Sequence, residues 1–167
     1  MIDDPKKRFI ERNNKQCDAW IFTEDEVREL IKKGKSPLTR AFLSLSFFLK
    51  GKDVAVQTLK FENLCISDNA ICITEPYRQP IRLPDWVTGY LMEYIETKIC
   101  EPANLVFPHP LDETDTIDFA LVWAMLRRLV CDNIVTNNMR ERHECRNALY
   151  RAIFGVFYLR RRYVGRG

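Results

Sequence analysis

The sequence predicts a mixed α+β domain, mostly helical, with one small three-stranded antiparallel sheet. Helical patterns occupy both ends of the chain, and three short apolar runs lie between them. Helices and strands that occupy separate stretches of sequence are typical of α+β folds. A chain of 167 residues, 46% hydrophobic and 29% charged, suits one domain with a core of its own.

Three helices are expected before the sheet. Thr23 and Glu26 have the spacing of a capping box, which satisfies two free amides at a helix start. Ser36 followed by Pro37 is a typical cap and first turn, and the Leu- and Phe-rich stretch that follows is expected in the core. We expect the helices to run to Lys33, over residues 38–49, and from Asp53 through Leu59.

The three apolar runs are expected to form the sheet. Two of them, 64–66 and 70–73, are separated by Asp68-Asn69, a good two-residue hairpin turn. The third run spans 80–83, and Pro80 suits an edge strand because it cannot donate a hydrogen bond to a neighbour.

The second half is expected to be helical. A helix begins near Pro84, and an acidic loop, 112–115, leads into a helix that is apolar on nearly every side and is therefore expected to be buried. We expect these helices at 84–99, 117–130 and 139–163.

Residues 1–20 are expected to form a flexible lead-in, and 21–167 a single domain. The net charge is +3, but the stretch from Arg140 to Gly167 holds eight Arg and two Glu, a balance of +6, so the remainder carries −3. This asymmetry favours a polyanion-binding face. A solvated helix surface with a loose tail would give the same composition, which leaves both interpretations open.

The six cysteines include no C-x-x-C pair, so we expect no structural zinc or other metal site. Reduced, mostly buried thiols are expected. Cys65 and Cys72 can face each other across the hairpin, and their redox state is left open. No stretch reaches the ~20 apolar residues of a membrane helix, and the polar N-terminus is no secretory signal. We therefore expect no membrane partner and a cytoplasmic or nuclear location.

The order of elements and several motifs together resemble the catalytic domain of tyrosine recombinases, the phage-integrase family. The resemblance covers roughly residues 22–158. Its most telling part is His143-Glu144-Cys145-Arg146, which is similar to the family's His-x-x-Arg box at the start of a helix. The other parts are Thr23–Val27, Leu45–Leu64 (with its final pattern at Leu59–Leu64), Ile81–Pro84 and Leu105–Pro108.

In that family a tyrosine attacks a DNA phosphate, two arginines hold its oxygens, and a lysine and a histidine handle protons. The resemblance assigns Arg146 as the second arginine and His143 as the box histidine. Lys52 stands near the position of the family's first arginine. Arg78 is the cation available in the loop where the family has its hairpin lysine. It also implies DNA contacts from Arg142, Arg151 and Asn147.

The resemblance places the nucleophilic tyrosine on a later helix, which we expect this chain to lack. The leading hypothesis is therefore a double-stranded DNA-binding domain, weak or inactive in catalysis, with no cofactor. It would form homo-oligomers on DNA through its C-terminal segment. Two alternatives stay open: an active integrase seen as a fragment, and a protein-interaction module that does not bind DNA.

Overall fold

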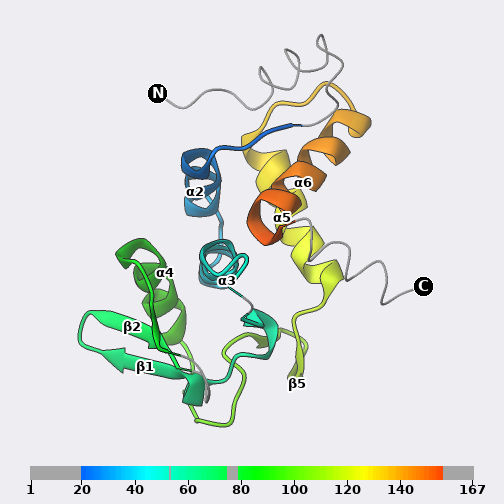
Figure 1. Cartoon of the computed structure of the whole chain (residues 1–167). Coiled ribbons are helices and arrows are strands. Elements are labelled where there is room, and N and C mark those ends of the chain that lie inside the picture. Colours follow the sequence, from blue (N-terminus) through cyan, green and yellow to red (C-terminus); the bar gives the residue numbers. More distant parts are fainter. Residues whose placement is uncertain (1–19, 53, 75–78, 156–167) are drawn as a thin grey trace. The chain divides into compact units, whose positions relative to one another are not determined.

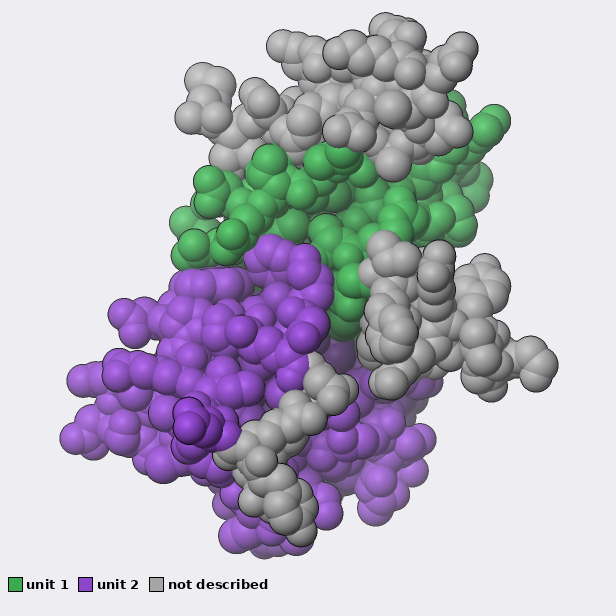
Figure 2. Space-filling view, in the orientation of Figure 1, with its two compact units in different colours: residues 1–34, 120–167 green, residues 35–119 purple. Residues whose placement is uncertain are grey.

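The computed structural model describes residues 20–52, 54–74 and 79–155 (Figure 1). The chain divides into two compact units (Figure 2). Unit 1 contains residues 1–34 and 120–167, and unit 2 contains residues 35–119. The expected lead-in, 1–20, lies outside the described residues except for Trp20, which is buried. The expectation of a single domain over 21–167 stays a prediction.

The α+β class and the three-stranded antiparallel sheet are confirmed. In the described residues the helices are α2 (Glu24–Lys32), α3 (Pro37–Phe48), α4 (Asp85–Ile95), α5 (Phe119–Asn133) and α6 (Met139–Phe154), with 3-10 turns at Val56–Thr58 and Phe61–Asn63. The strands are β1 (Leu64–Ser67), β2 (Ala70–Ile73), β3 (Ile81–Arg82), β4 (Pro108–His109) and β5 (Asp112–Thr116).

In unit 1, helix α2 packs against α6, and the expected capping box fixes its start. The Glu26 amide donates to Thr23 Oγ1 (3.3 Å), and the Thr23 amide donates to Glu26 Oε1 (2.9 Å). Each bond satisfies a main-chain donor that a helix start leaves free. The apolar stripe of α2, which includes Val27 and Ile31, can then turn inward to the core.

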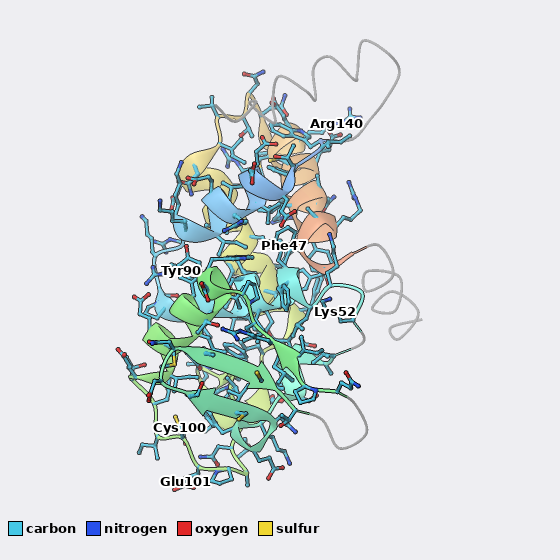
Figure 3. All side chains as sticks on the ribbon, turned by 60° about the vertical axis from the view of Figure 1, so that its left-hand side comes forward. Phe47, Lys52, Tyr90, Cys100, Glu101 and Arg140 are labelled. Atoms are coloured by element: carbon cyan, nitrogen blue, oxygen red, sulfur yellow. The ribbon has the colours of Figure 1, made fainter. Side chains whose placement is uncertain are left out.

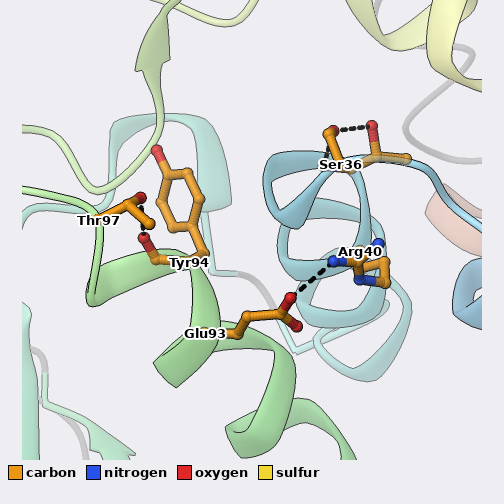
Figure 4. A network of polar contacts seen from close by, with 6 residues as sticks. Ser36, Arg40, Glu93, Tyr94 and Thr97 are labelled. Carbon is orange, nitrogen blue, oxygen red and sulfur yellow. Dashed lines mark hydrogen bonds and ion pairs between the residues drawn. The ribbon is translucent and has the colours of Figure 1, made fainter.

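In unit 2, helices α3 and α4 pack against each other around Phe107. The Phe107 ring meets Phe42 edge-on at 5.4 Å and stacks on Tyr94 at 5.2 Å. At the margin of this contact, Arg40 Nη2 donates to Glu93 Oε1 at 2.8 Å (Figure 4). An exposed ion pair of this kind contributes little, so burial of the aromatic rings holds the two helices together.

The sheet of unit 2 has the order β1-β2-β3, and all its pairs are antiparallel. Alternate residues of β2 have opposite surroundings: Ile71 and Ile73 are buried, while Cys72 between them is half-buried. Successive side chains of a strand point to opposite faces, so one face of the sheet covers the core. The other face carries Cys65, Cys72 and Arg82, which follow each other across the three strands.

The expected helix from Asp53 through Leu59 is wrong. One 3-10 turn, Val56–Thr58, takes its place, and Asp53 lies outside the described residues. Leu59 is committed to a non-local partner, since its carbonyl accepts from the Val106 amide at 2.8 Å. This long-range pairing requires extended backbone, which overrides the local cap signal.

The acidic segment 112–115 was expected to be a loop, which is also wrong. It lies in β5, which pairs with β4. Its side chains are exposed, so it lacks the alternating apolar pattern by which a strand is recognised. Helix α4 ends at Ile95 rather than near residue 99; there the Thr97 hydroxyl donates to the Tyr94 carbonyl (2.8 Å; Figure 4) and so satisfies a carbonyl of the last turn.

The last two helices also differ from expectation. Helix α5 is not buried on nearly every side, because Ala124, Arg127 and Arg128 are exposed. Helix α6 stops at Phe154 instead of continuing to Tyr163, since Gly155 leaves the helix with a φ of 83°. Residues 156–163 lie outside the described residues. No helix of the described part has both the length and the apolar character needed to cross a membrane.

The expectation of mostly buried thiols is wrong as well. Among the described cysteines, all free, only Cys145 is buried; Cys72 is half-buried, and Cys65, Cys100 and Cys131 are exposed.

We predict that Leu126→Ala lowers the free energy of unfolding by about 2–5 kcal/mol, because it leaves a cavity in a close-packed core. The Leu126 side chain is 0% exposed. Urea unfolding followed by circular dichroism measures the change. Leu111→Ala is the matched control: Leu111 is 91% exposed, so its truncation should cost under about 0.5 kcal/mol. Equal effects for the two variants would contradict the described burial.

We also predict an alkaline loss of stability from Tyr94. Its hydroxyl donates to the Val106 carbonyl at 2.8 Å. Burial, and secondarily the charge of Cys100, raise the pKa of Tyr94 from 10.0 to about 12. Because the folded-state pKa is the higher one, this stabilisation is complete below pH 10 and is lost as the pH rises from 10 towards 12.

Unfolding free energies measured across this alkaline range should therefore fall less steeply in Tyr94→Phe than in the wild type. At neutral pH the same variant should lose only about 0.5–1.5 kcal/mol, the usual net worth of one hydrogen bond. Identical alkaline slopes would rule out Tyr94 as the source.

Candidate functional site

The described site lies in unit 1, where Arg146 and His143 of α6 meet Trp123 of α5. The Arg146 guanidinium carbon lies over the Trp123 ring, 4.2 Å from its centroid. The His143 ring meets the same indole nearly perpendicularly, with a centroid separation of 6.3 Å. Tyr150, which is buried, packs edge-on against Trp123 at 5.4 Å. One indole thus positions three side chains of the neighbouring helix.

The N-terminal cap of α6 defines where the helix begins and thus where these side chains lie along it. Asn138 is the N-cap, and its Oδ1 accepts from the Glu141 amide at 2.8 Å. The buried Glu141 carboxylate reaches back and accepts from the Asn137 amide at 2.9 Å. A helix started in this way has a defined first turn, so His143 and Arg146 project from its next turns in fixed directions.

His143 and Arg146 are linked directly. Arg146 Nη2 lies 2.6 Å from His143 Nδ1. A guanidinium has only donors, so a hydrogen bond in this contact requires Nδ1 to accept, which is the tautomer with its proton on Nε2. The bond and the Trp123 stack together hold the plane of the guanidinium in a fixed orientation.

The electrostatics of the site are those of a cation cluster. Burial lowers the pKa of Arg146, the nearby charge of Arg127 lowers it further, and Cys131 acts in the opposite direction. Arg146 Nε is buried and meets no acceptor within the described residues. By contrast, Arg128 pairs with Asp132 (3.7 Å) and Arg140 with Glu144 (3.3 Å).

Four arginines of the two helices have no carboxylate partner in the part of the chain that the structure describes: Arg127, Arg142, Arg146 and Arg151. Two like charges close together repel each other, and a bound anion offsets this repulsion. The charge of Arg127 makes such an unfavourable contribution at Arg146, where it lowers the pKa of the guanidinium.

The sequence-predicted residues are distributed unevenly. Lys52 belongs to unit 2, where its Nζ lies 5.2 Å from the centroid of the Phe48 ring at the end of α3 (Figure 3). Arg78 lies outside the described residues. The convergence of Lys52 and Arg78 with the His143–Arg146 pair therefore stays a prediction.

The predicted DNA contacts on α6 do not share one side of the helix. Arg142 is one turn before Arg146 and lies on the same side. Arg151 follows Arg142 by nine residues, which places the two about 180° apart around the axis. Asn147 is turned roughly 140° from Arg142 and lies nearer to Arg151.

Sequence reasoning missed Trp123 and Arg127. They are four residues apart on α5, with Cys131 four residues further, so the three line one stripe of that helix. The available signal was the Arg127-Arg128 pair, which interrupts an otherwise apolar run and marks an exposed side. In the described residues, no three His, Cys, Asp or Glu side chains gather in a way that could hold a metal ion.

Comparison with known proteins adds no family: no family model matches this chain, and no curated protein matches it.

We predict that neutral His143 is the Nε2–H tautomer, and that Arg146→Ala abolishes this preference by removing the donor to Nδ1. Nitrogen-15 NMR of the imidazole rings at a pH well above about 6.5, the ordinary histidine pKa, reports the tautomer. The chain has only two histidines. His109 Nδ1 accepts from the Leu111 amide (3.1 Å), so its signals should stay unchanged and serve as the internal control.

A neutral His143 in the Nδ1–H form in the wild-type chain would contradict the Arg146–His143 hydrogen bond.

Proposed function

We propose that this chain binds double-stranded DNA through the phosphate backbone, with the paired α5 and α6 helices of unit 1 as the contact surface. Arg146, held by Trp123 and His143, is the central phosphate ligand, and Arg127 is its neighbour. The observation that carries the proposal is the Arg146 guanidinium, which lies over the Trp123 ring and has no carboxylate partner within the described residues.

Three further features support a nucleic-acid backbone as the anion. The surface carries arginine, whose planar fork binds two phosphate oxygens at once. The guanidinium is fixed before any ligand arrives, so less conformational entropy is lost on binding. The His143-x-x-Arg146 spacing is the part of the sequence that most resembles the DNA-binding recombinases, which makes a DNA phosphate the first candidate.

The proposal is binding rather than strand cleavage. Tyr150 is one helical turn after Arg146, but its side chain is 0% exposed and packs between Trp123 and Phe154. A hydroxyl in that position cannot attack a phosphate in solution, because the nucleophile must reach the reacting phosphorus. Recombinase-type catalysis would need a tyrosine from another part of the chain or from a partner.

We predict that binding to duplex DNA weakens steeply with salt, because each neutralised phosphate releases counterions. Fluorescence anisotropy of a labelled duplex, measured over a series of salt concentrations, gives the slope of log K against log salt. Loss of Arg146 in Arg146→Ala should weaken binding roughly 5- to 150-fold, or about 1–3 kcal/mol, and reduce the slope by about one. No binding at low salt would overturn the proposal.

Two adjacent residues of α5 provide the matched comparison. Arg127→Ala should weaken DNA binding and reduce the salt slope by about one phosphate contact. Arg128→Ala removes the same charge from the next position, but Arg128 already pairs with Asp132, so the expected loss is smaller. Both side chains are exposed, so neither change should unfold the chain, which circular dichroism checks. Equal losses for the two variants would indicate only a net-charge effect.

A further inference from the structure

The outer face of the β1–β2 hairpin carries two thiols directly opposite each other. Cys65 of β1 is the cross-strand partner of Cys72 of β2, and both are free. Cys65 is exposed and Cys72 is half-buried, while the opposite face of β2 is turned to the core through Ile71 and Ile73. Reagents in solution therefore reach this pair without opening the core.

The pairing brings the two residues within the reach of a disulfide. The Thr74 amide donates to the Asn63 carbonyl at 2.7 Å, which marks 63–74 as a hydrogen-bonded pair. Such pairs alternate along antiparallel strands, so Cys65–Cys72 is of the same kind. The Cα atoms of a hydrogen-bonded pair are about 5.5 Å apart. Disulfides span Cα separations of about 4.4–6.8 Å, so a bond can form without any change of the strand register.

The same geometry makes the bond easy to reduce. Opposed Cβ atoms in a sheet are about 4.5–5.5 Å apart, whereas a relaxed disulfide has them at about 3.5–4.5 Å. Closure therefore keeps the strand register but strains the bond or the strands slightly at an exposed position. Strained and exposed disulfides are the labile ones, in contrast to buried structural bridges.

The geometry points to Cys65 and Cys72 as a reversible redox modification site, a dithiol that low-molecular-weight disulfides such as oxidised glutathione convert to an intramolecular disulfide. Arg82 lies opposite Cys72 on the same face and offers a cation to the carboxylates of glutathione. The site belongs to unit 2 and does not depend on the proposed DNA binding.

The reaction proceeds in two exchange steps. The more exposed Cys65 thiol loses its proton, and its sulfur attacks oxidised glutathione; a mixed disulfide forms, and one glutathione leaves as thiol. The Cys72 thiol then loses its proton and attacks the Cys65 sulfur, which releases the second glutathione. In total the two protein thiols are oxidised by two electrons, and one glutathione disulfide is reduced to two thiols.

The test is mass spectrometry of the full reduced chain after treatment with oxidised glutathione and alkylation of the remaining thiols. In the wild type, peptide mapping should find Cys65 linked to Cys72, with two hydrogens lost and no glutathione on either residue. In Cys72→Ser the second step is blocked, so glutathione should accumulate on Cys65. Dithiothreitol should restore both thiols of the wild type.

A parallel reaction in concentrated urea separates the strand register from mere closeness in sequence. Without the hairpin, the selective Cys65–Cys72 link should give way to a mixture of cysteine pairings. Persistent glutathione on Cys65 of the folded wild type would overturn the inference. So would a hairpin pair that stays reduced while exposed Cys100 reacts. Both outcomes are read on the wild-type chain, so they hold whether or not a serine variant folds.

Discussion

The stack of Arg146 on the Trp123 ring is the contact from which the rest of the candidate site follows. An indole face attracts a cation, and an arginine plane covers it with large contact area at little cost in hydration. The same indole also packs against buried Tyr150, so it is anchored to the core of unit 1. A charged group thereby takes its orientation from the hydrophobic core, and the orientation is set before any ligand binds.

The fixed guanidinium of Arg146 also determines the role of His143, which lies next to it. The ring accepts a hydrogen bond from the guanidinium, so it adds no second positive charge to Arg146 in that contact. The like-charge contribution instead comes from Arg127 on the other helix. A bound anion at Arg146 would offset this unfavourable like-charge contribution. That preference for an anion, more than net charge alone, is why we propose a phosphate-binding surface.

Local signals in the sequence predicted the helix starts and the hairpin. Thr23 and Ser36 each accept a hydrogen bond from a main-chain amide three residues further on, so their effect is decided locally. Likewise, the two-residue turn and the alternation of apolar residues fix the β1–β2 register. Features decided by distant residues were not predictable. Leu59 is extended because Val106 pairs with it, and β5 is a strand because β4 lies beside it.

In the candidate site, too, only the features decided within one helix could be predicted from the sequence. His143 and Arg146 are three residues apart on one helix, so their contact follows from helical spacing once α6 is given. Trp123 comes from another helix, and no local pattern identifies which tryptophan will meet which arginine.

In the β1–β2 hairpin, the two-residue periodicity of a strand places neighbouring residues on opposite faces. Because side chains alternate along β2, the isoleucines at 71 and 73 enter the core and Cys72 between them is directed outward. The same register that makes the isoleucines a core face aligns Cys72 with Cys65. A shift of the strand register by one residue would bury a thiol and expose an isoleucine. It would also separate the two sulfurs. The hydrophobic core of unit 2 therefore maintains the thiol pair, although neither thiol contributes to that core.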